Sequence, residues 1–206
     1  MNTRCQFRTV RWIAGVVRRH PLGEAFFNRP RYTIHLVPLI LLNTVFSWSQ
    51  SAGPTELQVK AAYLYNFGKF VTWQTDRTAT SDTLQICVLG KDPFGAVLDS
   101  TVAGERIAGR TITVRRVAKV QDAGPCSILF VSASEEGKLG SVLASTQSLS
   151  ALTISDIPHF AEKGGMIGFV RQQDRIRFEV NRSAAEQGRL VLSSELLKVA
   201  VKVLGN

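Results

Sequence analysis

The sequence contains none of the short motifs that most often signal nucleotide or acyl chemistry. It has no Gly-x-Gly-x-x-Gly turn after a predicted strand, no phosphate-binding loop ending in Gly-Lys-Ser/Thr, and no Gly-x-Ser-x-Gly elbow. These absences argue against a dinucleotide enzyme, a nucleoside triphosphatase and an α/β-hydrolase. We therefore expect no catalytic residues and no cofactor, and look for a binding function instead.

Histidine is also scarce, and residues 52–206 contain only His159. Asp156 lies three residues before it, but one Asp and one His form an incomplete metal site. We therefore predict no metal centre. Ser155 and Asp156 follow a predicted strand, where α/β proteins form ligand crevices. The simpler alternative is that Asp156 caps the next turn.

Acidic residues are nearly absent from the first 51 positions, which contain seven Arg and only Glu24. An apolar stretch over residues 33–48 follows, and then Ser49-Gln50-Ser51. A basic region, a short apolar region and a small-residue exit are typical of a secretory signal peptide. We predict that residues 1–51 are removed, most plausibly after Ser51. An uncleaved anchor is the alternative, but Pro38 and Asn43 interrupt a stretch shorter than the ~20 residues of a membrane span.

Once this leader is set aside, the remaining 155 residues have a net charge of only about +3 out of the +9 of the whole chain. The high isoelectric point therefore reflects targeting and not nucleic-acid binding. Arg115–Arg116 is the one adjacent basic pair in this part of the chain, and a solvated strand edge accounts for it. The length suits one domain, residues 52–206.

Cysteine is rare as well, since only Cys87 and Cys126 remain after residue 51. Two cysteines in an exported domain suggest a disulfide, and each lies in or beside an apolar strand-like run. On the chain-entropy model, closing a loop of about forty residues would stabilise the fold by roughly 4 kcal/mol. Two buried free thiols are the alternative.

The rest of the pattern alternates strands and helices. Thr55-x-x-Gln58 matches a capping box before an amphipathic helix. Later elements are expected as follows: strands at 84–89, 111–117, 128–132 and 152–155, and helices at 94–102, 135–146, 183–187 and 194–203. We predict an α/β fold, a single three-layer domain whose mixed, mostly parallel sheet is flanked by helices and ends in a C-terminal β-hairpin.

Two segments carry further expectations. Gly90 to Gly95 joins a strand to a helix, and it either holds an anion at the helix N-terminus or simply forms a tight turn. Residues 166–170 form an apolar run, and residues 175–181 then alternate strictly between polar and apolar side chains. Three polar residues separate the two runs, which predicts a β-hairpin.

The chain resembles the YfiR family of secreted bacterial proteins. The resemblance lies in VKAAYLYNFGKFVTW (59–73), ICVLGKDPFG (86–95), GRTITVRRV (109–117), CSILFVS (126–132) and the block from Leu152 to Ala200, which includes GGMIGFV and RFEVN. It covers roughly residues 57–203. It supports the Cys87–Cys126 bridge, because family members carry cysteines at these two motifs. The second cysteine pair of some members is missing between Phe160 and Val170.

The resemblance implies a function. YfiR-like proteins are periplasmic regulators that bind the sensor domain of an inner-membrane diguanylate cyclase, hold it inactive, and so lower cyclic di-GMP and biofilm formation. Such proteins tend to be dimers. The family is thought to use the C-terminal region for these contacts, which makes Glu179, Asn181 and Ile167 candidate partner-binding residues. Ordinary solvated strand positions and core packing are the alternatives. A periplasmic ligand-binding module that reports to a receptor or kinase is the second functional hypothesis.

Overall fold

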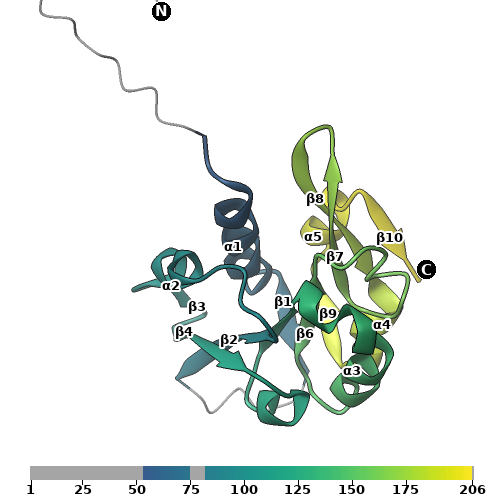
Figure 1. Ribbon diagram of the computed structural model, residues 1–206, viewed down its shortest axis with the longest axis horizontal. Helices are drawn as coiled ribbons and strands as arrows, with labels where there is room; N and C mark the ends of the chain where they lie inside the picture. The colour runs from purple at the N-terminus through teal and green to yellow at the C-terminus, as the bar shows by residue number, and fades with distance from the viewer. Residues whose placement is uncertain (1–52, 75–81, 206) are drawn as a thin grey trace, which may run out of the picture. The chain divides into compact units, whose positions relative to one another are not determined.

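The computed structural model describes residues 53–74 and 82–205. The predicted leader and its cleavage site lie outside the described residues. The described part is an α/β structure with helices on both faces of a mixed, mostly parallel sheet, as predicted (Figure 1).

The elements follow one another as helices, strands and two short 3₁₀ turns. In chain order they are α1 (Glu56–Phe67), β1 (Val71–Trp73), β2 (Thr83–Leu89), α2 (Ala96–Val102), β3 (Arg106–Ile107), β4 (Arg110–Val117), η1 (Val120–Ala123), β5 (Ile128–Val131), η2 (Ala133–Lys138), α3 (Leu139–Thr146), β6 (Leu152–Ser155), β7 (Ile167–Gln172), β8 (Arg175–Asn181), α4 (Arg182–Gln187), β9 (Leu190–Leu192), α5 (Ser194–Val199) and β10 (Lys202–Leu204).

The main sheet has the strand order β10-β8-β7-β6-β5-β2-β4-β3. Strands β4, β2, β5, β6 and β7 run parallel to one another, whereas β8 is antiparallel to β7 and β3 is antiparallel to β4. Helices cover both faces of the parallel part, so its central strands β5 and β6 are buried at every position.

Side chains alternate between two cores, one on each face of the sheet. Ile86 and Val88 point into the larger core, which includes residues of α1 and α2, whereas Cys87 and Leu89 point into a smaller core with residues of α3 and η1. Cys87 and Cys126 form the predicted disulfide within the smaller core, with their Cα atoms 5.8 Å apart. The alternative of two free thiols is therefore wrong.

Helix α1 begins with the predicted capping box. The Gln58 amide donates to Thr55 Oγ1, and the Thr55 amide donates to Gln58 Oε1 at 2.7 Å. These two bonds satisfy amides that lack partners within the helix. Phe67 at the other end of α1 packs against Tyr63 and against the rings of Phe169 and Phe178 on the hairpin.

The hairpin forms as predicted but with a shorter turn. Gln172 pairs with Arg175, so only Gln173 and Asp174 form the loop, not three residues. Both have positive φ, 48° and 56°, as a tight two-residue hairpin turn requires. The twist of paired strands favours this left-handed turn even though neither residue is glycine.

Two predicted helices differ from the structure. The segment expected as one helix over 135–146 is the 3₁₀ turn η2 followed by α3. The last expected helix ends at Val199, because Ala200 is extended and residues 202–204 pair with β8 as β10. Val203 is β-branched and suits a strand, and β8 offers the edge to which residues 202–204 pair. The small sheet β1–β9 was not predicted, since its strands are three residues long and far apart in sequence.

Candidate functional site

The three predicted partner-binding residues do not share one surface. Glu179 and Asn181 lie on one face of β8, because alternate residues of a strand point the same way. Ile167 pairs directly with Val180, so it lies on the opposite face, and its side chain is fully buried in the larger core. Only Glu179 and Asn181 are therefore brought together, and both are half-buried.

Asn181 is the N-cap residue of α4. Its Oδ1 accepts a hydrogen bond from the Ala184 amide at 2.9 Å, which caps the helix. Its Nδ2 donates to the Ala161 carbonyl at 2.8 Å, and its own amide donates to the Met166 carbonyl at 2.7 Å. Asn181 thus joins β8, α4 and the loop before β7.

Glu179 lies beside the outermost strand of the sheet, in register with Lys202 of β10. Lys202 Nζ contacts Glu162 Oε1 at 2.6 Å, and Glu162 also contacts His159 Nδ1 at 2.9 Å. The hydrogen bonds from Lys202 and then His159 lower the pKa of Glu162, and the bond to Glu162 raises the pKa of Lys202. Glu179 thus lies next to a charged cluster that the loop 156–163 shares with β10.

Asp156 and His159 do not act together. Asp156 accepts a hydrogen bond from Lys60 of α1 at 2.7 Å, whereas His159 pairs with Glu162. The alternative that Asp156 caps the next turn is wrong, since its Oδ2 accepts from Lys60 and its Oδ1 has no partner among the described residues. Ser155 Oγ accepts a hydrogen bond from the Ile157 amide. The Asp156 carboxylate thus binds Lys60, 96 residues away in the sequence, and not the backbone of the turn that follows it.

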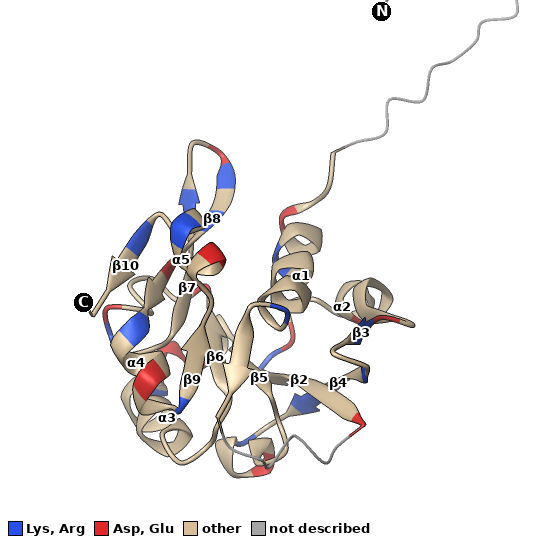
Figure 2. Cartoon of the chain, turned by 180° about the vertical axis from the view of Figure 1, so that it is seen from behind, with Lys and Arg blue, Asp and Glu red and all other residues tan. Residues whose placement is uncertain are grey.

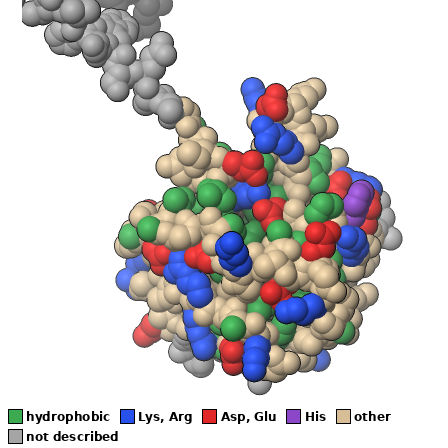
Figure 3. Space-filling model, in the orientation of Figure 1, with side chains coloured by type: hydrophobic (Ala, Val, Ile, Leu, Met, Phe, Trp, Pro, Cys, Tyr) green, Lys and Arg blue, Asp and Glu red, His purple; other side chains and the backbone are tan. Residues whose placement is uncertain are grey.

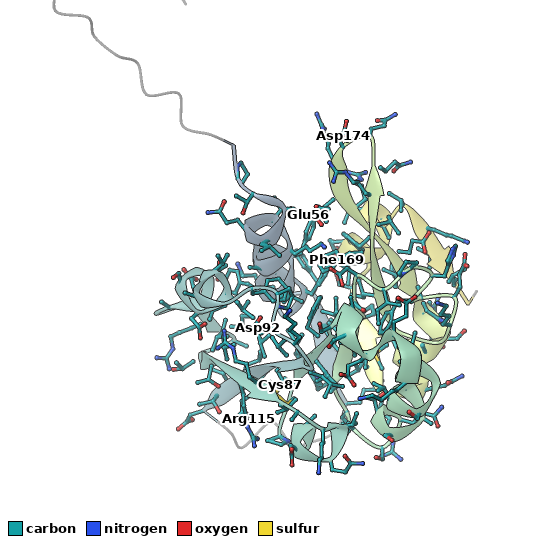
Figure 4. The ribbon with its side chains drawn as sticks, in the orientation of Figure 1. Glu56, Cys87, Asp92, Arg115, Phe169 and Asp174 are labelled. Carbon is teal, nitrogen blue, oxygen red and sulfur yellow. A yellow bond between two sulfur atoms is a disulfide. The ribbon has the colours of Figure 1, made fainter. Side chains whose placement is uncertain are left out.

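Lys60 is a buried cation that the sequence did not reveal as a site residue. Its side chain is 8% exposed, and its Nζ also contacts Glu56 Oε1 at 2.7 Å. Glu56 in turn lies 3.6 Å from Arg171 on the hairpin. These contacts connect α1, the end of β6 and the hairpin; Figure 4 shows Glu56 on α1 and Asp174 at the hairpin turn. A lysine on the apolar face of α1, four residues after Glu56, is the signal that could have found it.

Protonation in this network favours the charged forms. Burial lowers the pKa of Lys60, but hydrogen bonds to Asp156 and then Glu56 outweigh it, so the pKa is raised overall. The hydrogen bond from Lys60 lowers the pKa of Glu56. One atom remains without a hydrogen bond, because Asp156 Oδ1 is buried and has no partner among the described residues.

The loop from Gly90 to Gly95 does not present an open anion site. Arg116 of β4 reaches over it and contacts Asp92 Oδ2 at 2.9 Å and Asp99 Oδ2 at 2.6 Å, and it donates to the Gly95 carbonyl at 2.8 Å. The hydrogen bond from Arg116 lowers the pKa of Asp99. The two carboxylates would repel an anion here, which supports the tight-turn alternative. Arg116 is therefore an internal ion-pair partner and not simply a solvated strand residue.

Hollows occur on the surface between these elements. One of about 460 Å³ lies between α4, β9 and α5 and includes Ala185, Leu190 and Leu197 in its lining. Another of about 410 Å³ lies between the first two turns of α1 and the hairpin, where Tyr63, Arg171 and Ile176 line it. Both are open to solvent, and Figure 3 shows the charged side chains around the projecting hairpin.

Among the described residues, no group of three His, Cys, Asp or Glu side chains could hold a metal ion. Within the same ranges, no helix is long and apolar enough to span a bilayer.

Solved structures with a similar chain path have low sequence identity. A conserved domain protein from Vibrio cholerae O1 biovar El Tor is 8% identical, with a TM-score of 0.48 over 72% of this chain and 60% of that chain. An ABC domain in complex with L-Trp from Streptococcus pneumoniae is 13% identical, with a TM-score of 0.47 over 70% and 60% of the two chains. The present chain thus spans about 60% of the length of either structure. No curated protein matches the sequence.

A family model matches residues 57–201, which run from the second residue of α1 to beyond the end of α5 and contain the disulfide, the Lys60–Asp156 pair and the hairpin. The match agrees with the resemblance seen in the sequence motifs. The chain belongs to the YfiR/HmsC-like family.

Proposed function

We propose that this protein is a periplasmic regulator that represses an inner-membrane diguanylate cyclase by binding its periplasmic domain. Membership of the YfiR/HmsC-like family over residues 57–201 carries the proposal. The disulfide agrees with an oxidising compartment such as the periplasm. Export would use residues 1–51 as a cleaved signal peptide. N-terminal sequencing of the periplasmic form tests this, with residue 52 as the expected first residue.

Repression of this kind is differential binding. A binding protein shifts a cyclase between active and inactive states only to the extent that it prefers the inactive one. Moving the cyclase from 99% active to 99% inactive needs a preference of about 10⁴-fold. No chemical step is required of the repressor, and the regulatory, non-catalytic character of the family fits this mechanism.

We propose that the face of β8 and β10 that carries Glu179 and Asn181 is part of the repressing surface. Glu179 is its candidate contact, because it is half-buried, in register with Lys202, and next to the Glu162–Lys202 pair. Asn181 would act by positioning α4 beside this face. The Ile167 side chain is fully buried on the opposite face and cannot contact a partner while the strands are paired. Its role would be indirect, to hold β7 in register with β8 beneath Glu179 and Asn181.

The first test is cellular cyclic di-GMP with and without the gene in the native host. We expect the level to rise on deletion and to return when the exported protein is supplied. Glu179→Lys should derepress the cyclase at normal protein abundance, and Asp122→Lys, at an exposed position of η1 outside β8, β10 and α4, is the matched control. An unchanged level after deletion would overturn the proposed function, whereas an unchanged level in Glu179→Lys alone would overturn only this surface.

The hollow between α4, β9 and α5 favours a second candidate, a small-ligand module that reports to a receptor or kinase. Its volume of about 460 Å³ lies in the range of small-molecule sites, and apolar and charged side chains, Leu197 and Arg182 among them, line it. A thermal-shift screen of periplasmic metabolites tests it. A saturable rise in Tm that Leu197→Trp abolishes would support this candidate.

A further inference from the structure

The hairpin β7–β8 leaves part of its outer edge without a neighbouring strand. β10 pairs with β8 only from Glu179 to Asn181, while β8 begins at Arg175 (Figure 1). The Phe178 carbonyl points to this outer side, since it accepts a hydrogen bond from the Val201 amide. Residues two apart on a strand direct their backbone groups alike, so Ile176 offers its N–H and C=O at the same edge. No strand among the described residues pairs with that edge at Ile176.

A groove of about 410 Å³ lies between α1 and the face of the hairpin that carries the Ile176 side chain. Val59 and Tyr63 of α1 form one wall, and Arg171 and Ile176 of the hairpin form the other. Val59, Tyr63 and Ile176 are each half-buried, so the groove has an apolar strip that is narrow but accessible. An edge with free backbone groups next to apolar side chains is the arrangement to which extended peptides add as a further strand.

The groove is lined by three arginines and two carboxylates, Glu56 and Asp174. Arg171, Arg175 and Arg177 lie within seven residues and are exposed. Figure 2 shows blue, basic segments on the projecting hairpin. Arg171 is already paired, because its guanidinium lies 3.3 Å from Asp174 and 3.6 Å from Glu56. Arg175 and Arg177 form no ion pair with any described residue, which leaves two cations free to bind an incoming acid.

The shape of the hairpin favours a protein over a lipid surface. Its turn consists of Gln173 and Asp174, preceded by Gln172, and all three side chains are polar and exposed. Membrane-surface segments bury apolar side chains among lipid chains, and this turn has none to bury. The apolar strip lies instead within the groove, where a peptide side chain fits and a bilayer does not.

We propose that this groove binds an extended acidic segment of a partner protein. The segment would add to the outer edge of β8 through the backbone groups of Ile176, set apolar side chains against Val59 and Tyr63, and place carboxylates near Arg175 and Arg177. Guanidinium–carboxylate pairs would fix the orientation of the bound segment, and they would make its affinity depend on the salt concentration. The proposal rests on the groove alone and does not depend on which protein supplies the segment.

The test uses a fluorescent eight-residue peptide of alternating Glu and Val and the purified protein. We expect saturable binding that falls about tenfold or more in the R175E/R177E variant and is equally weak for the Gln–Val peptide. The matched control is R115E/R189E, which reverses two exposed arginines outside the groove and should leave binding unchanged. Hydrogen exchange of the Ile176 amide should slow when the peptide is bound.

Each other outcome overturns the proposal in its own way. Absence of peptide binding removes the site, and equal losses in both double variants reduce it to general electrostatics. Peptide binding without protection of Ile176 removes the strand addition. Binding to phosphatidylglycerol vesicles but not to the peptide, lost in R175E/R177E, assigns the arginines to a lipid surface. Because none of these measurements involves cyclic di-GMP, failure here leaves the repression of a cyclase untouched.

Discussion

The two faces of the central sheet are stabilised by different means. The face toward α1 holds the larger core, with Phe67, Phe169 and Phe178 packed ring against ring. The opposite face has a smaller core, and the Cys87–Cys126 bridge lies within it. The comparison teaches that apolar burial suffices where large side chains are available, whereas a covalent link supplements the face with less apolar surface.

Phe67→Ala should have the largest effect, on the α1 face. Phe67 is 1% exposed and contacts three aromatic rings, so its removal leaves a cavity at the junction of α1 and the hairpin. We expect the free energy of unfolding to fall by about 4 kcal/mol or slightly more, measured by urea titration. A loss below that of the disulfide variant would reverse the ranking of the two faces.

Removal of the disulfide should come next. The bridge closes a loop between residues 39 apart, for which loop entropy predicts about 4 kcal/mol and measured losses are often smaller. We expect Cys87→Ala/Cys126→Ala to lose about 3 kcal/mol in urea titration and to become insensitive to reductant. Equal stability of the reduced wild-type protein and the oxidised one would show that the smaller core is sufficient by itself.

Lys60→Met tests the ion network on the α1 face and should have a smaller effect. Loss of the buried cation leaves Asp156, whose Oδ1 already lacks a partner, without its hydrogen bond from α1. We expect a loss of about 2 kcal/mol at pH 7, less than for a fully buried pair because Asp156 is partly exposed. Glu56→Gln is the control, because it removes only the more exposed ion pair of Lys60. It should lower the free energy of unfolding by less than about 1 kcal/mol.

The pH dependence of this contribution follows from the raised pKa of Lys60. Its stabilisation is fully present below the ordinary value of 10.5 and is lost as the pH rises through the higher pKa of the folded state. The pKa of Glu56 is lowered, so its contribution to stability is fully present above pH 4.5 and is lost as the pH falls through the lower pKa of the folded state. The difference in the free energy of unfolding between wild type and Lys60→Met, measured by urea titration, should therefore be constant up to about pH 10.5 and shrink as the pH rises further. A difference that stays constant above that pH as well would argue that Lys60 stabilises the fold by packing and not by charge.

Much of the fold was predictable because its signals are local. The capping box at Thr55 and Gln58, the apolar runs of β2, β5 and β6, and the alternation of residues 175–181 each depend on neighbours within one element. Strand–helix alternation then leads to a mostly parallel sheet with few other arrangements. The disulfide followed from two cysteines beside such strands, in a chain expected to be exported.

The sequence by itself determined the α/β class, the strand periodicity, the cysteine pair and the motifs of the family. Only the tertiary structure decided which carboxylate each cation meets, as Lys60 with Asp156 and Arg116 with Asp99 show. It also decided that Ile167 is buried while Glu179 faces the other way, and that residues 202–204 leave the helix to pair with β8. The reason is physical: local patterns fix which way a side chain points within its element, whereas its partners depend on which elements the packed sheet brings together.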